Sequence, residues 1–226
     1  MRTLFATIAD RYDFITRFLS YGQDRRWKRR LVALASPAAG TRALDVATGT
    51  GDIAFAVAAR GARVIGLDVT ERMIELARRR TSAPGSTASL QPSFLVGDMI
   101  ALPFRDAAFD LVTTGYGLRN VPNLQQAIDE IRRVLVRGGQ LLSLDFNRPA
   151  NPLVRAVYLR YLAGVGAALG WALHRDPDTY RYIPESIRIY PGAEGVASMF
   201  ERSGFTGVRA YPVLGGLMTI HHAVRA

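Results

Sequence analysis

The stretch 43–52, Ala-Leu-Asp-Val-Ala-Thr-Gly-Thr-Gly-Asp, constrains the fold more than any other part of the chain. Its first residues are mostly apolar and predict a short buried strand, and Gly49 and Gly51 allow a turn whose backbone comes close to a ligand. The helix predicted from Asp52 presents unpaired N–H groups at its start. A strand, a glycine-rich turn and a helix in this order are typical of a nucleotide-binding fold.

Two further carboxylates stand where strands are predicted to end. Asp68 ends an apolar segment about twenty residues after the glycines, where such folds place an acid on the ribose hydroxyls. Asp98 ends the next apolar segment. The third position of the pyrophosphate fingerprint G-x-G-x-x-G is Ala54, and Asp52 disfavours an anion. The pattern therefore favours a cationic nucleoside without phosphates, such as S-adenosylmethionine, over NAD.

Composition excludes several classes of function. The 226 residues are enough for one domain with a substantial core, and the lack of cysteine excludes disulfides, thiolate metal sites and cysteine nucleophiles. The formal net charge is +10, yet no basic tail or aromatic-interleaved arginine tract is present, so nucleic acid is not expected as a partner. The first ten residues hold no apolar signal segment, which predicts a cytoplasmic protein.

Alternating segments predict an α/β fold. Strands are expected at 43–47, 63–68, 94–98, 109–114 and 140–146, with helices at 52–60, 70–80 and 123–136 between them. This order predicts a parallel sheet with right-handed crossovers. After an inserted segment, a helix over 193–202 and strands over 207–211 and 217–224 complete the chain.

Two segments lie outside this core. Residues 5–34 carry apolar residues at helical spacing and predict two or three short helices that cap the binding face. Within them, Tyr12 and Asp13 either line a substrate cavity or only pack and cap. The block 151–184 contains an uncharged run of 13 residues, 161–173. Because a membrane-spanning helix needs roughly 20 residues, we expect this block to form a lid instead.

Several motifs are shared with one protein family. They are Phe5…Ile8-Ala9-x-Arg11-Tyr12-Asp13, Asp24-Arg-Arg-Trp27, Leu44-Asp-Val-Ala-x-Gly-Thr-Gly-Asp52, Ala101-Leu-Pro-Phe104, Gly117-Leu-Arg-Asn-Val121, Tyr182-x-Pro-Glu-Ser-Ile187 and Gly215-Gly216. On these motifs the chain resembles, over nearly its whole length, the class I S-adenosylmethionine-dependent methyltransferases. More narrowly, it resembles the quinone-biosynthesis C-methyltransferases of the ubiE/MenG/COQ5 group.

The resemblance implies a Rossmann-like fold: a seven-stranded, mostly parallel sheet whose last strand is antiparallel, with helices on both faces. It also implies C-methylation of a prenylated hydroquinone, either demethylmenaquinol or the related benzoquinol of ubiquinone synthesis. Four residues depart from those usual in the family: Thr16, Thr48, Tyr116 and Leu214. Those at Thr16, Tyr116 and Leu214 permit one alternative, a methyltransferase of a small secondary metabolite. A second alternative, of a different class, is a non-catalytic cofactor-binding scaffold.

The expected organisation is a single domain over 1–226. It comprises a helical cap (1–40), a cofactor-binding core (41–147), a lid or substrate insertion (148–190) and a C-terminal helix with a strand pair (191–226).

The resemblance assigns cofactor contacts to Thr50, Asp68, Asp98, Met99 and Gly115. The chemistry agrees for the carboxylates, because Asp68 can accept hydrogen bonds from both ribose hydroxyls and Asp98 can accept one from the adenine amino group. Asp45 either binds the methionine ammonium or caps the turn. Asp52 either caps its helix or faces the cofactor.

Methyl transfer to a ring carbon requires that an adjacent hydroquinone hydroxyl lose its proton. The protein must therefore position the substrate, stabilise a phenolate and carry one proton away. We expect Arg119, in the loop after the fourth strand, to stabilise the phenolate or to orient a water; the alternative is an ion pair with an acid. Asn120, Tyr182 and Ser186 are the other substrate-side candidates, and Glu185 either accepts a proton or pairs with an arginine.

No metal site is expected, because His221 and His222 are adjacent on a strand and point to opposite faces. The apolar block 153–173 either sheaths an isoprenoid tail and docks on the anionic inner face of the membrane, or forms an ordinary buried helix pair. It is flanked by four arginines: Arg148, Arg155, Arg160 and Arg175. The sequence leaves open whether the chain forms a homodimer.

Overall fold

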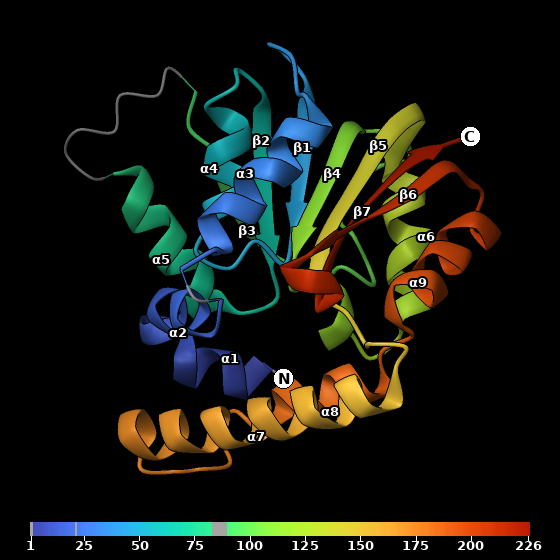
Figure 1. Ribbon diagram of the computed structural model, residues 1–226. Helices are drawn as coiled ribbons and strands as arrows, with labels where there is room; N and C mark the ends of the chain where they lie inside the picture. The colour runs from blue at the N-terminus through green and yellow to red at the C-terminus, as the bar shows by residue number, and fades with distance from the viewer. Residues whose placement is uncertain (1, 21, 83–89) are drawn as a thin grey trace.

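The computed structural model describes residues 2–20, 22–82 and 90–226, without the side chains of residues 2, 3 and 13. At its centre is one seven-stranded sheet in the order β3-β2-β1-β4-β5-β7-β6 (Figure 1). The strands are β1 (Arg42–Val46), β2 (Arg63–Asp68), β3 (Ser93–Val96), β4 (Phe109–Gly115), β5 (Leu135–Phe146), β6 (Phe205–Val213) and β7 (Met218–Arg225). Only β7 runs antiparallel to its neighbours, so the predicted fold class is confirmed.

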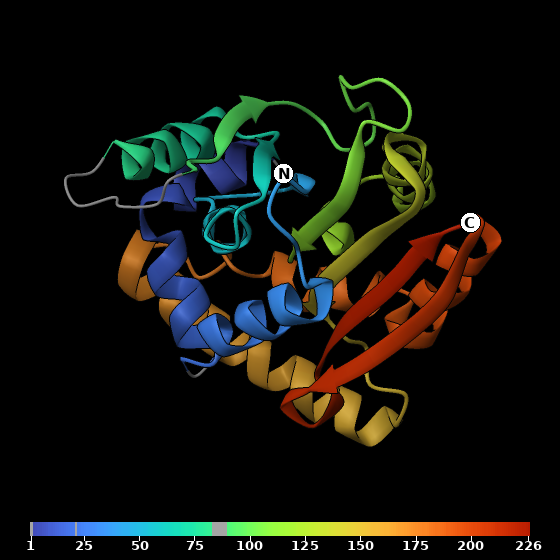
Figure 2. The ribbon, with the colours of Figure 1, turned by 90° about the horizontal axis from the view of Figure 1, so that it is seen from above.

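Helices cover both faces of the sheet (Figure 2). The helices α3 (Asp24–Ala35), α4 (Asp52–Ala58) and α5 (Glu71–Thr81) bury apolar side chains on one face. The helices α6 (Leu124–Val134) and α9 (Gly192–Arg202) do so on the other. Strand order reverses between β1 and β4, and in parallel sheets ligands bind outside the carboxyl ends of the strands at such a point.

A layer of helices lies beneath the carboxyl ends of the parallel strands (Figure 1). It consists of α1 (Arg2–Ile8), the 3₁₀ turn Ala9–Arg11, α2 (Tyr12–Leu19), α7 (Pro152–His174) and α8 (Tyr182–Ile189). We call it the cap layer. Segments far apart in sequence form its core, where Ile8 and Ile15 pack with Leu162, Tyr180 and Ile183.

The helix α7 is longer than the sequence pattern predicted. It is 23 residues long, and it begins at Pro152 because Asn151 caps its start by accepting hydrogen bonds from the N–H groups of Leu153 and Val154. Among the residues that the structure describes, it is the one helix long and apolar enough to cross a membrane by length and composition. The uncharged run 161–173 is therefore only part of a longer helix, and the expected role of this block as a lid stays a prediction.

The start of β5 also differs from the prediction. The helix expected to reach residue 136 ends at Val134, and the backbone at Leu135 is extended. Leu135 then pairs with Phe109 before the register shifts, and regular pairing with β4 resumes at Gln140. Long-range pairing with β4 thus overrides the local helical pattern at this boundary.

Candidate active site

A cavity of about 360 Å³ opens at the carboxyl ends of β1, β2, β3 and β4, a volume in the range of small-molecule sites. Loops after these strands and two cap residues line it: Phe5, Tyr12, Ala47, Gly49, Leu67, Asp68, Val69, Met73, Gly97, Asp98, Met99, Gly115, Tyr116, Gly117, Asn120, Val121 and Pro122. We call it the acidic cavity, because Asp68 and Asp98 are the charged residues among them. No lysine or arginine stands among these described lining residues, although the chain as a whole carries +10.

Asp68 holds the glycine-rich turn and faces the cavity. Its Oδ2 accepts a hydrogen bond from the Gly49 N–H at 2.9 Å, and its Oδ1 accepts one from the Thr70 N–H at 2.8 Å. Burial raises the pKa of this carboxyl against the lowering effect of these bonds. A carboxylate has about four lone-pair positions, so the two oxygens retain acceptor capacity for ligand hydroxyls.

The opposite wall is formed by Gly115, Tyr116 and Gly117. A Cβ at Gly115 would lie 2.8 Å from Ile53 Cδ1, and one at Gly117 would lie 2.7 Å from Ala47 Cβ. Glycine is therefore required at position 117 for this loop to pack against the turn after β1, whereas at position 115 the neighbour is the flexible end of the Ile53 side chain in α4. Of the predicted cofactor residues, Gly49, Asp68, Asp98, Met99 and Gly115 come together around the acidic cavity.

Three predicted cofactor residues do not line it. Asp45 is buried within β1, where it accepts hydrogen bonds from the hydroxyls of Thr48 at 2.6 Å and Thr113 at 2.7 Å. Burial raises its pKa to about 6. Of the two roles left open by the sequence, this geometry favours stabilisation of the turn. The carbonyl of Thr50 accepts a hydrogen bond from Arg80, and Gly51, with φ 91°, precedes α4.

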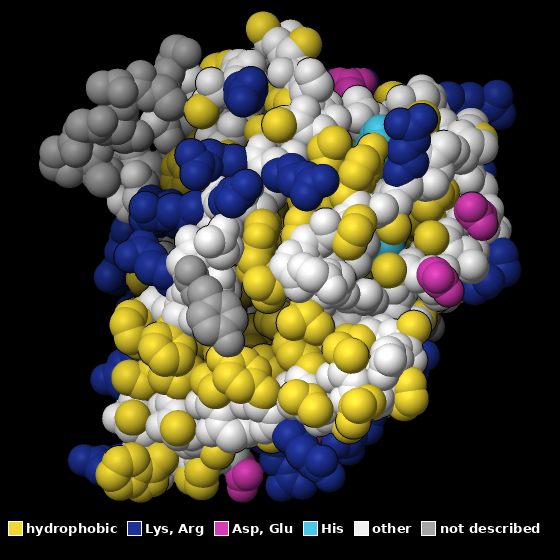
Figure 3. All heavy atoms as spheres, viewed as in Figure 1, with side chains coloured by type: hydrophobic (Ala, Val, Ile, Leu, Met, Phe, Trp, Pro, Cys, Tyr) yellow, Lys and Arg dark blue, Asp and Glu magenta, His cyan; other side chains and the backbone are white. Residues whose placement is uncertain are grey.

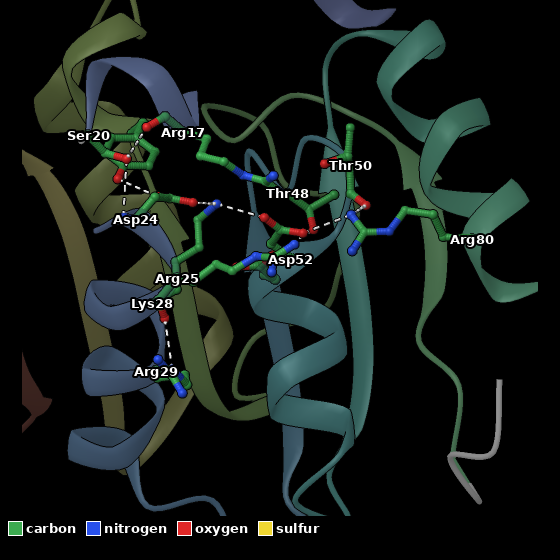
Figure 4. A network of polar contacts seen from close by, with 12 residues as sticks. Arg17, Ser20, Asp24, Arg25, Lys28, Arg29, Thr48, Thr50, Asp52 and Arg80 are labelled. Atoms are coloured by element: carbon green, nitrogen blue, oxygen red, sulfur yellow. Dashed lines mark hydrogen bonds and ion pairs between the residues drawn. The ribbon is translucent and has the colours of Figure 1, made fainter. Parts of the chain in front are cut away.

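Asp52 is not among the residues that line the acidic cavity. It is the first residue of α4, directly after the N-cap Gly51. Its side chain pairs with Lys28 at 2.9 Å and with Arg80 at 2.8 Å (Figure 4). Burial alone would raise its pKa, but these two cations outweigh burial and lower it. The negative character of the cavity therefore comes from Asp68 and Asp98, and not from Asp52 as the sequence suggested.

A second space of about 30 Å³ adjoins the acidic cavity on the side of the cap layer. Tyr12 and Tyr116 line both spaces. The other lining residues are Ile8, Ile15, Thr16, Leu19, Ser20, Trp27, Arg119, Phe146, Tyr182, Ile183 and Met218. We call it the inner pocket. Of the predicted catalytic residues, Arg119 and Tyr182 lie here, Asn120 lies on the acidic cavity, and the Asp13 side chain is outside the described part of the chain.

Arg119 is buried and held from several sides. Its Nε lies 3.0 Å from Asp145 Oδ1, and its Nη1 donates a hydrogen bond of 2.6 Å to the Ser186 hydroxyl. Its guanidinium carbon lies 4.7 Å from the Phe146 ring centroid and 5.7 Å from that of Tyr182. Burial opposes its charge, but Asp145, Tyr182 and Tyr12 together outweigh burial and raise the pKa of Arg119. The predicted alternative, an ion pair, is thus present, and the same guanidinium lines the inner pocket.

The remaining candidates have structural partners. The Asn120 amide donates to the Tyr116 carbonyl at 2.9 Å and fixes the loop that carries Arg119. Glu185 accepts from Arg181 Nε at 2.9 Å on the surface, so pairing with an arginine is the role observed.

A buried hydrogen bond joins two site residues that no sequence pattern connects. The Tyr116 hydroxyl donates to Asp24 Oδ1 at 2.6 Å, and both side chains are buried. Tyr116 has φ 62°, a conformation uncommon for a bulky residue. The two residues are 92 positions apart, so no local spacing connects them; the tyrosine at 116, noted only as a departure from the family, was the available sign.

An apolar groove of about 520 Å³ leads outward from the inner pocket, with which it shares Leu19, Phe146 and Met218. Its other walls come from α7 and the turn before β7: Leu153, Val154, Val157, Tyr158, Tyr161, Leu162, Leu214 and Leu217. We call it the outer groove.

The histidines of β7 have ordinary partners. His221 Nε2 lies 2.9 Å from the Ala193 carbonyl oxygen, and burial lowers the pKa of its ring. His222 Nε2 lies 3.0 Å from the Gln140 side-chain oxygen. Within residues 2–20, 22–82 and 90–226, no three or more His, Cys, Asp or Glu side chains are grouped as metal ligands.

Comparison with known proteins gives consistent matches. The model of the ubiE/COQ5 methyltransferase family matches residues 1–225. The chain is 41% identical over 220 residues to a demethylmenaquinone methyltransferase of Thermus thermophilus, covering 96% of this chain and 98% of that one. It is 39% identical over 220 residues to a ubiquinone/menaquinone biosynthesis C-methyltransferase UbiE of Dinoroseobacter shibae, covering 96% and 87%.

Solved structures agree on the fold. A S-adenosylmethionine-dependent methyltransferase of Thermotoga maritima, described as a possible histamine N-methyltransferase, superimposes with a TM-score of 0.70. It shares 18% identity over the full length of both chains, a likeness that shows the fold alone.

Proposed function

The chain belongs to the ubiE/COQ5 methyltransferase family, and from this premise we propose that it transfers a methyl group from S-adenosylmethionine to a ring carbon of a prenylated hydroquinone. The substrate is demethylmenaquinol or the related benzoquinol of ubiquinone synthesis. One observation carries the proposal: the acidic cavity, the inner pocket and the outer groove adjoin in that order. They offer space for a cationic cofactor, a ring and an apolar tail, respectively.

The residues of the acidic cavity fit this cofactor. Its nucleoside carries hydroxyls and an amino group, for which Asp68 and Asp98 provide acceptors, and its positive charge matches a lining without lysine or arginine. When bound, it supplies an electrophilic methyl group. Tyr12 and Tyr116 stand between this cavity and the inner pocket, where the acceptor ring would lie.

Arg119 is the group suited to stabilise the ring phenolate. It is buried and cationic, and Asp145, Ser186 and the neighbouring aromatic rings fix its orientation. A pre-oriented charge in a site that excludes water stabilises a developing anion without reorganisation. Tyr182 contributes to the same wall and orients the ring against the guanidinium.

The cap layer acts as a lid in this proposal. The inner pocket has room for about two water molecules, far less than a quinol ring. The helices α2 and α8, which contribute most of its cap-side wall, would therefore separate to admit the ring and close again to exclude water.

The direct test is incubation of the purified protein with methyl-labelled S-adenosylmethionine and a reduced short-chain demethylmenaquinol, followed by product mass. We expect one added methyl group on a ring carbon. If polar aromatic acceptors are methylated and the quinol is not, the small-metabolite alternative holds. Cofactor binding without methylation of either acceptor would favour the scaffold.

We also propose that the cap layer docks on an anionic membrane surface, from which the prenylated substrate would enter the outer groove. The proposal is supported by large apolar side chains left exposed on α2 and α7: Phe14, Phe18, Leu153, Val154, Val157, Tyr161 and Trp171. Figure 3 shows hydrophobic side chains gathered over this part of the molecule, with basic side chains around them. Such a surface suits the interface between lipid tails and head groups.

A further inference from the structure

We propose that Tyr116 and Asp24 form the route by which the proton of the reacting hydroxyl leaves the inner pocket, with Tyr116 as a catalytic residue. This inference rests on the proposed quinol methylation and adds to it the missing proton acceptor. The reaction releases one proton for each methyl group added, and the inner pocket is buried. A path for that proton is therefore a requirement of the chemistry.

Tyr116 is in the right place to receive the proton. It lines both the acidic cavity and the inner pocket, so it borders the point where ring and cofactor would meet. Its hydroxyl already donates a short hydrogen bond of 2.6 Å to the carboxylate of Asp24, which is 6% exposed. The unusual φ of 62° at Tyr116 shows that the loop holds this residue in a conformation with a backbone cost.

Asp24 connects this hydroxyl to the surface. Its Oδ2 lies 2.7 Å from Lys28 Nζ, and Lys28 Nζ also lies 2.9 Å from Asp52 Oδ2 (Figure 4). Asp24, Lys28 and Asp52 line a polar pocket of about 80 Å³, together with Thr16, Arg17, Gly22, Arg25 and Arg80. Because the side chain of Asp52 is 31% exposed, this pocket reaches solvent. The Asp24 carboxylate thus separates the inner pocket from a polar exit.

Other groups around the inner pocket are poorer acceptors. Arg119 is already a cation. Asp145 carries the charge that balances Arg119 and accepts hydrogen bonds from the N–H groups of Arg119 and Phe146. Among the described side chains, the remaining carboxylate joined to the pocket by a hydrogen bond is Asp24, through Tyr116.

The proton transfer balances as follows. The substrate O–H gives its proton to Tyr116 Oη while Tyr116 gives its own proton to Asp24 Oδ1, and the electron pair left on the substrate oxygen makes the ring carbon nucleophilic. Asp24 then passes the proton to water in the polar pocket and becomes a carboxylate again. After the ring carbon has gained the methyl group, it loses its hydrogen as a proton while the substrate oxygen regains one, so that one proton is released for each methyl group added. Burial raises the pKa of Tyr116 well above its ordinary value, so this phenol accepts a proton only as it donates one.

The first test compares Tyr116→Phe with the unaltered protein in the quinol assay. We expect kcat to fall about 100-fold or more, as for loss of a general base, with KM and cofactor affinity unchanged. The defect should shrink with rising pH, or with a fluorinated quinol, because a more acidic hydroxyl needs less help. Other charged and titratable groups face Tyr116: Asp24 and Lys28 of α3, Tyr12 of α2 and Asp145 of β5. Because these groups can also change kcat with pH, the pH profile of kcat is measured for the variant and the parent under identical conditions.

Tyr190→Phe is the matched control. Tyr190 is also buried, its hydroxyl has no hydrogen-bond partner among the described residues, and it lines neither the acidic cavity nor the inner pocket. Its variant should keep the parent kcat. Asp24→Asn should lose activity like Tyr116→Phe, and the double variant should be no slower than either single one, because a relay fails as a unit.

A second readout needs no cofactor. A nitro-substituted naphthol, whose phenol and phenolate absorb at different wavelengths, is mixed with the cofactor-free protein and its ionisation is followed by stopped flow. We expect ionisation to be at least ten times slower in Tyr116→Phe than in Tyr190→Phe. If the parent methylates the quinol and Tyr116→Phe has a kcat within about threefold of the parent value, the proton relay is wrong and the proposed function stands. If the parent methylates no quinol, both fail.

Discussion

A single substitution at Arg119 can show whether its positive charge is enough for activity, or whether its oriented contacts with Asp145 and Ser186 are also needed. Arg119→Lys keeps a cation but loses the fork that contacts Asp145 and Ser186. We expect kcat to fall by about 100-fold, the order seen when an oriented donor to a developing anion is lost, with little change in cofactor affinity. Steady-state kinetics with the quinol and calorimetric titration with the cofactor measure the two effects.

Arg119→Ala alone is a poor test, because it leaves Asp145 buried without a partner at a cost of about 3–5 kcal/mol. The control is a double variant, Arg119→Met with Asp145→Leu, which removes both charges together. We expect it to regain most of the stability lost in Arg119→Ala and none of the activity. Activity that returned with stability would show that the ion pair serves the fold alone.

Asp45 makes the stability of the protein depend on pH. Burial raises its pKa from 3.8 to about 6, so between these values the folded chain holds a proton that the unfolded chain has released. The free energy of unfolding should therefore fall as pH rises from about 4 to 6, by on the order of 3 kcal/mol, and then level off. Urea denaturation at a series of pH values measures it. In Asp45→Asn this part of the pH dependence should vanish; an unchanged slope would contradict it.

The residues that were predictable from sequence are those fixed by local order. Asp68 and Asp98 stand at or just after strand ends, and the carboxyl ends of parallel strands share one edge of the sheet. Asp45, inside β1, and Asp52, at the start of α4, flank the same glycine-rich turn, yet their side chains turn to Thr48 and to Lys28. Local pattern fixes where the backbone goes, whereas the direction of a carboxylate depends on partners brought by other elements.

At the scale of elements, the helix α7 depends on glycine where it meets the chain that follows it. A Cβ at Gly170 would clash with the backbone oxygen of Asp176 and lie 3.2 Å from Pro177 Cα. At Gly164, on the same helix, a Cβ would meet nothing within 4 Å. The same substitution should therefore have opposite effects at the two positions.

We expect Gly170→Ala to lower the free energy of unfolding by about 1–3 kcal/mol, because backbone cannot move aside as a side chain can. Gly164→Ala should raise it by about 0.5–1 kcal/mol, since alanine favours helix at an unhindered site. Denaturant unfolding of both variants gives the comparison. Equal effects at both positions would show that the backbone of the turn after α7 does not pack closely against the helix at Gly170.

The elements themselves were largely predictable, and their boundaries less so. Capping residues and glycines indicated where the core helices begin and end. The 13-residue uncharged run gave too short a length for α7, because Arg155 and Arg160 lie within the 23 residues of this helix. Charged residues are tolerated there because part of this helix surface is exposed. The 3.6-residue period of apolar residues predicts that a helix forms. The length of the helix depends on which of its faces pack against other elements.

At the scale of the whole molecule, the packing of the cap layer is the feature least predictable from a single sequence. Its core joins Ile8 and Ile15 to Tyr158, Tyr180 and Ile187, positions more than 140 residues apart. No periodicity predicts such a pairing. The consequence is an outer face on which Phe18 and Trp171 remain 52% and 60% exposed, and this face gives the membrane proposal its test.

Phe18→Ser combined with Trp171→Ser should abolish flotation with anionic vesicles. Burial of a large apolar side chain contributes about 1.5–3 kcal/mol, so the pair should weaken partitioning by about 100-fold or more. Leu95→Ser, at a 39% exposed position on β3, is the control and should float like the parent. Binding should also weaken with added salt and on zwitterionic vesicles, because the surrounding arginines act through the lipid charge.

The same variants show whether this apolar face binds a membrane or a second copy of the chain. If the apolar face is a homodimer interface, the double variant should turn a dimer into a monomer in sedimentation without vesicles, and the parent should not float. A monomeric parent that floats, with a monomeric variant that does not, supports the membrane. In that case the turnover of a long-tailed quinol presented in vesicles should fall in the double variant, while that of a short-tailed, dispersed quinol is unchanged, because only the long-tailed substrate has to be collected from the bilayer.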